Sequence, residues 1–240
     1  MKLVVAEKPS VAMSLSKVIG ADKRQDGYLE GNGYLVSWCI GHLVELSAPE
    51  RYNERFAKWR LEDLPILPER FLYEVSVGTS KQYQILKGLM ERPDVESLVC
   101  ATDAGREGEL IFRFVYNQCR CKKPFERLWI SSMEDAAIRE GFEKLKPGTA
   151  YDALYEAALY RERADWIGGM NATRLFSCLS GQTLAMGRVM TPTLAMMVMR
   201  DAQIAAVKLT WINPRASICD SRRRAALGGR THAPADTPPV

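Results

Sequence analysis

The sequence predicts an α/β fold in which helices flank a mixed, mainly parallel sheet. Two short apolar runs, at residues 2–6 and 95–101, have the composition of buried strands. A helical pattern follows each of them: one runs from Pro9 to Gly20, and the other buries an apolar face after residue 106. Strands that alternate with helices in this way indicate a sheet covered by helices.

The remaining elements are predicted from local patterns. Residues 28–45 alternate and carry several glycines, which indicates a pair of hairpin strands. Residues 47–70 contain three prolines and should be irregular, whereas 82–92 should be helical and 127–130 should form a third buried strand. Ser132 with Asp135 three residues later predicts a capping box for a helix that ends near residue 145.

The chain is predicted to contain three parts. Residues 1–148 form the α/β domain, and residues 149–207 form an incomplete helical domain whose helices are separated by glycine pairs. Residues 208–240 lose all periodicity and gain Arg, Ala, Gly and Pro, so we expect them to be disordered.

Composition indicates an ordinary globular protein. Of the 240 residues 47% are hydrophobic and 26% are charged, and no run approaches the roughly 18 apolar residues of a membrane span. Charges at Glu7 and Lys8 exclude a secretory signal at the start of the printed sequence. The six cysteines contain no Cys-x-x-Cys pair, so we expect reduced thiols and a cytoplasmic protein.

The net charge of +4 does not by itself indicate nucleic-acid binding. Residues 208–240 carry six basic and two acidic residues, which leaves 27 of each in residues 1–207. Any DNA site must therefore be local.

Three carboxylates are candidates for a metal site. Glu7 and Asp103 each follow a predicted strand, and the carboxyl ends of parallel strands meet at one edge of a sheet. Glu107 follows Asp103 by four residues. Clustered carboxylates repel each other unless a cation neutralises them, and Mg²⁺ prefers such oxygen ligands. The alternative is a solvated surface turn with an Arg–Glu pair.

The segments "VVAEKPSVA" and "ATDAGREGELIFR" resemble the Toprim domain of type IA DNA topoisomerases, in particular the topoisomerase III branch. The resemblance continues through "GYLEGNGYLVSWCIGHLVEL", "RLWISSM", "RADWIGGMNATRLF" and "GRVMTPTLAM", over roughly residues 1–206. It implies a Toprim domain followed by a helical domain. It also implies Mg²⁺-dependent, ATP-independent strand passage on single-stranded or underwound DNA, without a nucleotide cofactor.

The resemblance assigns roles to individual residues. Glu7 matches a catalytic glutamate that can bind metal or act as an acid, and Lys8 matches a lysine that stabilises the leaving oxygen. Asp103 and Glu107 match the outer acids of an Asp-x-Asp-x-Glu motif, so with Glu7 they are the expected metal ligands. Gly105 stands where the middle acid is expected, and the missing carboxylate should weaken Mg²⁺ binding. A glycine at this position could also allow a turn with positive φ.

A second set of residues resembles the family's strand-binding segments. Met190 replaces the glutamine that is usual in the Gly-Arg-Val-Gln-Thr-Pro segment. Trp166 and Phe176 are predicted to be core residues, and His42 is predicted to be structural. The expected DNA-binding residues are Arg106, Arg161, Asp165, Asn171, Arg174, Gln182, Gly187, Arg188, Val189, Met190 and Thr191.

The family cuts DNA with a tyrosine hydroxyl, and none of the nine tyrosines lies in the family's Tyr-Pro-Arg-Thr or Tyr-Thr-Arg-Thr context. We therefore expect a truncated topoisomerase fragment without its nucleophile, and a tail after residue 207 that arose from loss of the reading frame or from divergence. The alternatives are a non-catalytic module that binds single-stranded DNA, or another Toprim enzyme such as a primase or nuclease. Residues 160–196 argue against the last, because they match the topoisomerase helical domain.

Overall fold

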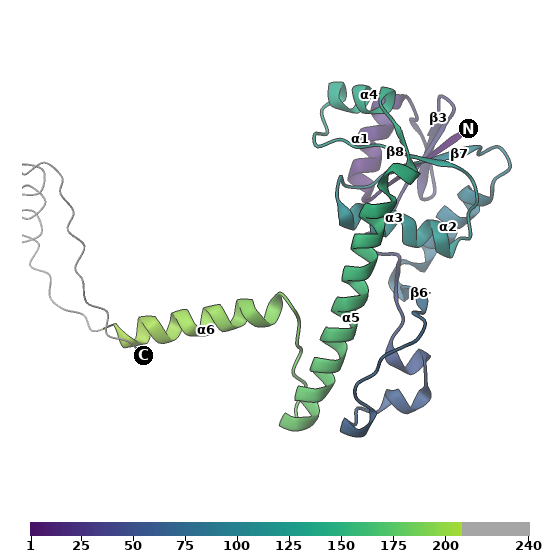
Figure 1. Cartoon of the computed structure of the whole chain (residues 1–240). Helices are drawn as coiled ribbons and strands as arrows, with labels where there is room; N and C mark the ends of the chain where they lie inside the picture. The colour runs from purple at the N-terminus through teal and green to yellow at the C-terminus, as the bar shows by residue number, and fades with distance from the viewer. Residues whose placement is uncertain (208–240) are drawn as a thin grey trace, which may run out of the picture. The chain divides into compact units, whose positions relative to one another are not determined.

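The computed structural model describes residues 1–207, and the tail predicted to be disordered lies outside them. One compact unit comprises Met1–Met190, and a second begins at Thr191 (Figure 1). Helix α6 (Met190–Ala206) belongs almost entirely to the second unit. No helix among the described residues is long and apolar enough to cross a membrane.

The first unit is built on a seven-stranded sheet in the order β2-β3-β4-β1-β7-β8-β9. Its centre is parallel, because β1 pairs in parallel with β4 and β7, and β7 pairs in parallel with β8. The outer pairs are antiparallel, so the predicted mixed, mainly parallel sheet is confirmed. The strands are β1 (Lys2–Ala6), β2 (Lys23–Gln25), β3 (Tyr28–Gly31), β4 (Tyr34–Trp38), β7 (Ser97–Ala101), β8 (Phe125–Arg127) and β9 (Lys146–Pro147).

Four helices cover the two faces of this sheet. Strand residues alternate between the faces: Leu3 and Val5 pack with α2 (Ser80–Glu91) and α3 (Arg106–Gln118), whereas Val4 and Ala6 pack with α1 (Pro9–Ile19) and α4 (Asp135–Glu143). All four strand residues are fully buried, as is expected for a parallel strand between two helical layers.

A long helix and an irregular segment extend beyond the sheet (Figure 1). The 29-residue helix α5 (Asp152–Ser180) lies beside residues 47–72, which contain the 3₁₀ turns η1 (Pro49–Arg51), η2 (Glu54–Ala57) and η3 (Leu61–Asp63). A small antiparallel ribbon, β5 (Val44–Leu46) with β6 (Tyr73–Val75), joins this segment to the sheet unit. Two further turns are η4 (Val77–Thr79) and η5 (Gly148–Tyr151).

Several local predictions were wrong. Strand β8 ends at Arg127, where the sequence predicted a strand to begin. The N-cap of α4 is Glu134 rather than Ser132, whose Oγ accepts from the Glu134 amide at 3.2 Å. Helix α5 continues through Gly168 and Gly169, because packing along its length outweighs the low helix propensity of two glycines.

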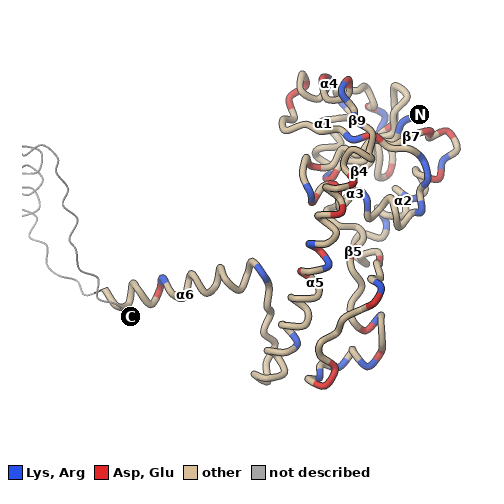
Figure 2. Tube along the Cα trace, viewed as in Figure 1, with Lys and Arg blue, Asp and Glu red and all other residues tan. Residues whose placement is uncertain are grey.

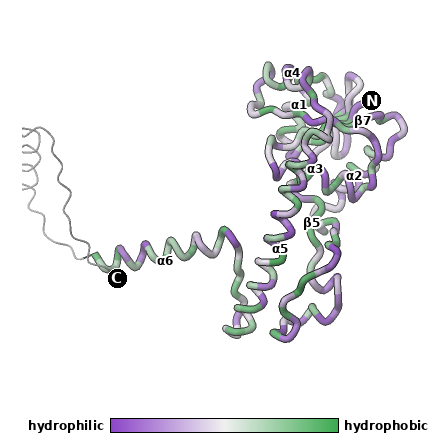
Figure 3. The backbone as a smooth tube through the Cα atoms, viewed as in Figure 1, coloured by the Kyte–Doolittle hydropathy of each residue, from purple (hydrophilic) through white to green (hydrophobic). Residues whose placement is uncertain are grey.

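Of the two aromatic residues predicted to be core, only one packs inward. Trp166 contacts Tyr52 and Phe71 with ring centroids 5.7 and 6.0 Å apart. Phe176 is 44% exposed, close to the exposed Leu179 near the end of α5. Figure 3 shows green, hydrophobic stretches along α5 and α6 as well as in the sheet, so hydropathy alone does not mark the core.

Candidate functional site

Two predicted site residues meet at the carboxyl edge of the parallel strands. Glu7 follows β1, Asp103 follows β7 by two residues, and the two strands are paired in register from Lys2–Ser97 to Ala6–Ala101. The Asp103 amide donates to Glu7 Oε2 at 3.2 Å. Glu7 is only 8% exposed, whereas Asp103 is exposed, so one carboxylate is held in place and the other faces solvent.

Lys8 lies beside the buried glutamate. Its Nζ is 3.6 Å from Glu7 Oε1, and its side chain is 57% exposed. At this distance the ammonium group and the carboxylate attract each other. The pair therefore presents a carboxylate and a proton donor side by side at the edge of the sheet.

Glu107 does not join Glu7 and Asp103 directly. It lies in the first turn of α3, where its Oε1 is 2.5 Å from His42 Nε2. This contact is an ion pair when the imidazole is protonated and otherwise a hydrogen bond donated by Nε2–H. His42 was predicted to be structural, so its contact with a predicted ligand was missed; its Gly-His-Leu context gave no signal for it.

The three expected ligands are thus not gathered into one cage. Among residues 1–207 no three His, Cys, Asp or Glu side chains converge well enough to hold a metal ion. Glu7 and Asp103 alone still fit Mg²⁺, which proteins commonly bind through one or two carboxylates together with water and substrate phosphates. These two carboxylates fit a Mg²⁺ site that is completed by water and phosphate, and they do not fit a site made by protein ligands alone.

Gly105 does not have the positive φ that the sequence suggested. Its φ of 179° and ψ of 176° are extended values that any residue adopts. A Cβ built at this position meets nothing within 4 Å. The backbone here therefore has room for the acid that the resemblance led us to expect.

Gly108, which the sequence did not single out, is constrained instead. A Cβ at Gly108 would lie 2.2 Å from the Asp103 carbonyl oxygen. The Gly108 carbonyl also accepts a 2.7 Å hydrogen bond from Thr102 Oγ1. Close packing of the start of α3 against the backbone of Asp103 thus requires glycine at this position.

A polar cavity of about 440 Å³ opens between the start of α3 and the middle of α5. Its charged lining mixes both signs, which agrees with the interspersed charges along α5 in Figure 2. Burial raises the pKa of the Glu162 carboxyl, another residue that the sequence did not indicate. The cavity is lined by Gly105, Arg106, Glu107, Ala158, Arg161, Glu162 and Asp165.

Asp165 is bound by two arginines, and only Arg161 lies four residues from it on the same helix. Arg161 Nε lies 3.9 Å from Asp165 Oδ2, while Arg188 donates to both Asp165 oxygens at 2.5 and 2.9 Å. The hydrogen bonds from Arg188 lower the pKa of Asp165. Arg188 is therefore bidentate with Asp165, and Arg161 is the more weakly held cation.

Two more of the expected DNA-binding residues are engaged within the protein. Arg174 is buried and donates to the Phe56 carbonyl at 2.6 Å. Asn171 exchanges hydrogen bonds with the backbone of Ile66, at 2.7 and 3.0 Å. Both side chains hold residues 47–72 against α5, so in this conformation neither is available to a DNA strand.

The other expected DNA-binding positions follow α5. Residues 182–190 lie beside the end of this helix, because Thr173 and Ser177 exchange hydrogen bonds with the backbone of Met186 and Leu184. Gln182, Val189 and Met190 are exposed and Gly187 is half-buried, while Thr191 begins the second unit.

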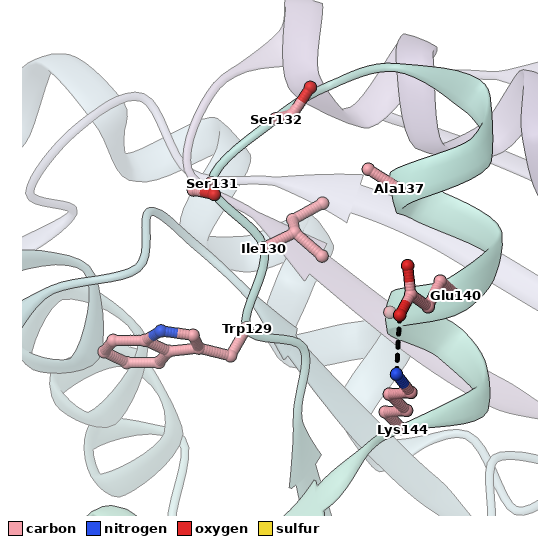
Figure 4. Close-up of a pocket in the computed structure, with 8 residues that line it drawn as sticks. Trp129, Ile130, Ser131, Ser132, Ala137, Glu140 and Lys144 are labelled. Atoms are coloured by element: carbon pink, nitrogen blue, oxygen red, sulfur yellow. Dashed lines mark hydrogen bonds and ion pairs between the residues drawn. The ribbon is translucent and has the colours of Figure 1, made fainter.

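A second cavity, of about 280 Å³, lies between α4 and the loop after β8 (Figure 4). Its lining includes Trp129, Ser132, Glu140 and Lys144, and the last two form an ion pair. None of the predicted site residues lines it, so the cavity beside Glu107 is the one that belongs to the candidate site.

Comparison with known proteins agrees with this arrangement. The Toprim domain family matches residues 2–133, and the family described as DNA topoisomerase matches residues 149–222. A curated DNA topoisomerase 3 from Bacillus anthracis is 50% identical over 206 residues, which are 86% of this chain and 28% of that protein. DNA topoisomerase 3 from Bacillus subtilis is 50% identical over 204 residues, and that from Shouchella clausii is 47% identical over 203. The chain thus spans about 28% of the length of these relatives.

A solved structure shares the fold. Full-length topoisomerase I from Thermotoga maritima has a TM-score of 0.58 and 23% identity, over 86% of this chain and 31% of that one. Since the Toprim match alone covers more than half of the sequence, the chain belongs to the Toprim family, in the type IA topoisomerase branch that contains DNA topoisomerase 3.

Proposed function

We propose that this chain is the part of a type IA DNA topoisomerase that holds Mg²⁺ and one DNA strand at the phosphate to be cut. The observation that carries the proposal is the meeting of Glu7 and Asp103 at the carboxyl ends of paired parallel strands. Lys8 lies beside Glu7, and the cavity lined by Arg106 and Arg161 begins at Gly105, two residues after Asp103, which supports a phosphate site there.

Glu7 and Asp103 would hold the metal ion. Bound Mg²⁺ would supply charge neutralisation at a phosphate oxygen. Glu107, which pairs with His42, would contribute only through a change of rotamer or through water. Because Gly105 provides no carboxylate, we expect weak binding of Mg²⁺.

The chain's own cations would position the strand. Arg106 and Arg161 face the cavity, and guanidinium groups bind phosphate oxygens in a bidentate manner. Lys8 would stabilise the leaving 3′-oxygen by donating a proton. No nucleotide cofactor is needed for these steps, and the substrate we propose is single-stranded or underwound DNA in the cytoplasm. The domain limits we propose remain residues 1–148 and 149–207.

The proposed chemistry lacks its nucleophile within these 240 residues. None of the seven residues that line the cavity is a tyrosine. The specific alternative is therefore a module that binds single-stranded DNA without cutting it, and we propose that the 240-residue chain behaves in this way when it is alone.

The test combines relaxation and binding. The chain with Mg²⁺ and negatively supercoiled plasmid should give no relaxation, and anisotropy should show modest, salt-dependent binding to a labelled single strand. Arg161→Ala and Arg106→Ala should each reduce affinity and flatten the slope of log K against log salt by about 0.7. Arg139→Ala, which removes an exposed arginine from α4, is the matched control and should bind normally. Equal DNA affinity for all three variants would refute the assignment of the cavity as the DNA-binding site.

A further inference from the structure

Arg127 is a charged side chain with no access to solvent. It ends β8 and is fully buried, and it is the largest of the fully buried side chains among the described residues. Charged groups are almost never buried in this way without several partners. Its partners therefore indicate what the residue does.

The guanidinium group of Arg127 is fixed on main-chain carbonyls. Nη1 donates to Cys100, Thr102 and Leu128 at 3.0, 2.8 and 2.9 Å, and Nη2 donates to Asp103 at 2.6 Å. Three of these four carbonyls belong to the segment that leads from β7 to the solvent-facing carboxylate of Asp103. The fork thus sets the path of the backbone on which a proposed metal ligand sits.

Glu109 balances the charge of this arginine. It too is fully buried, and its Oε2 lies 2.9 Å from Arg127 Nε, although the two atoms are not aligned as a hydrogen bond. Its Oε1 accepts from Arg113 Nε at 2.9 Å. Arg113 Nη2 also donates to the Gly148 carbonyl and to Asp152 Oδ1. Arg113 therefore shares Glu109 with Arg127 but touches no carbonyl of the Asp103 segment.

We propose that Arg127 is a positioning residue for the metal site, because its guanidinium fork holds the main chain of residues 100–103 and so aims the Asp103 carboxylate beside Glu7. The metal part of this inference rests on the proposed function, whereas the clamp on the backbone does not. Lysine in place of Arg127 would keep the charge but could not span the four carbonyls, since it lacks the planar fork.

The clamp can be tested without a metal ion. In hydrogen exchange of the whole chain, Arg127→Lys should speed exchange in the peptide that covers residues 101–107. Arg113→Lys, the matched control at the same glutamate, should leave that peptide as in the unchanged protein while loosening the contact with Asp152. If both variants loosen residues 101–107 equally, or neither does, the fork has no specific role and the inference fails.

The metal part needs a separate measurement. By titration calorimetry with MgCl₂, Arg127→Lys should lose about 10- to 100-fold in affinity, as is usual for groups that orient a metal ligand. Arg113→Lys should not. Absence of Mg²⁺ binding by the unchanged chain would refute the metal site of the proposed function. Hydrogen exchange would then test only whether Arg127 holds the main chain of residues 100–103.

A measurement on the unchanged protein covers the case in which Arg127→Lys does not fold. The side-chain ¹⁵N signals of Arg127 should shift when MgCl₂ is added, because they sense the loop that binds it, while those of Arg113 should stay in place. Equal shifts at the two arginines, or a shift at Arg113 alone, would overturn the inference.

Discussion

Gly108→Ala should displace the loop that carries Asp103. The added Cβ would lie 2.2 Å from the Asp103 oxygen and 2.9 Å from its nitrogen, both of which are main-chain atoms. To reach an ordinary contact of 3.4 Å, the Asp103 carbonyl must move by about 1.2 Å relative to α3. That carbonyl is also held by Arg127 at 2.6 Å, so the movement strains a buried hydrogen bond.

The expected loss of stability follows from these contacts. Overpacking of a tight site costs about 1–3 kcal/mol, and the higher helix propensity of alanine recovers at most about 1 kcal/mol. We expect Gly108→Ala to lower the free energy of unfolding by about 1–2 kcal/mol. Urea titration followed by circular dichroism measures this as a lower midpoint at constant slope.

Gly105→Ala is the matched control three residues earlier. Its Cβ meets nothing within 4 Å and its φ is extended, so the variant should be neutral or gain about 0.4–1 kcal/mol. Gly108→Ala should also weaken Mg²⁺ binding, whereas Gly105→Ala should not. Equal stability and equal Mg²⁺ affinity for the two variants would refute the argument that α3 packs directly against the Asp103 backbone.

Four further outcomes are expected. Gly105→Asp should fold and should bind Mg²⁺ more tightly than the unchanged chain in calorimetry, since the backbone has room for the side chain; unchanged affinity in a folded variant would place Gly105 outside the metal site. Burial raises the pKa of Glu162 in the folded chain, so the free energy of unfolding should fall as pH rises from the usual pKa of 4.5 through the folded pKa. Glu162→Gln should therefore be more stable than the unchanged chain at pH 7. Below pH 4.5 this advantage should vanish, because Glu162 is then protonated in both states. Arg174→Ala should lose about 1.5–3 kcal/mol of stability, because it leaves the Phe56 carbonyl without its charged donor, and should change DNA affinity only through unfolding. Labelled single-stranded DNA incubated with the chain and Mg²⁺ should yield no covalent adduct on denaturing gels, and one tyrosine-linked product would overturn the view that the nucleophile is missing.

The sheet could be predicted from sequence because its strands carry strong local signals. Lys2–Ala6 and Ser97–Ala101 are nearly continuous apolar runs, as buried parallel strands require. Because both strands are parallel neighbours, the positions of Glu7 and Asp103 at one edge follow from topology alone. Strand β8 is shorter and ends in a buried arginine, which a hydrophobic pattern cannot identify as a core residue.

The contacts that orient the site could not be predicted, because they join residues far apart in the chain. His42 reaches Glu107 across 65 positions, and Arg174 reaches Phe56 across 118. A family pattern assigns Arg174 to DNA, but only the fold shows that residues 47–72 lie against α5 and use this side chain. Arg161 and Asp165 are four residues apart on one helix and pair locally, whereas Arg188, the closer partner of Asp165, comes from 23 positions along the chain.

The charge balance of the cavity determines how a DNA strand would enter it. Asp165 is already paired there with two arginines, so a phosphate that binds either of them must take the cation from this carboxylate. Arg161 is held at 3.9 Å by an aspartate that Arg188 already binds in bidentate fashion, so Arg161 is released at the lowest cost. Loss of the weaker pair leaves Asp165 neutralised by Arg188, whereas loss of Arg188 would leave the carboxylate with a distant partner. Of the two arginines bound to Asp165, we therefore expect Arg161 to take up the phosphate first, and Mg²⁺ at Glu7 and Asp103 to strengthen binding by offsetting the nearby carboxylates.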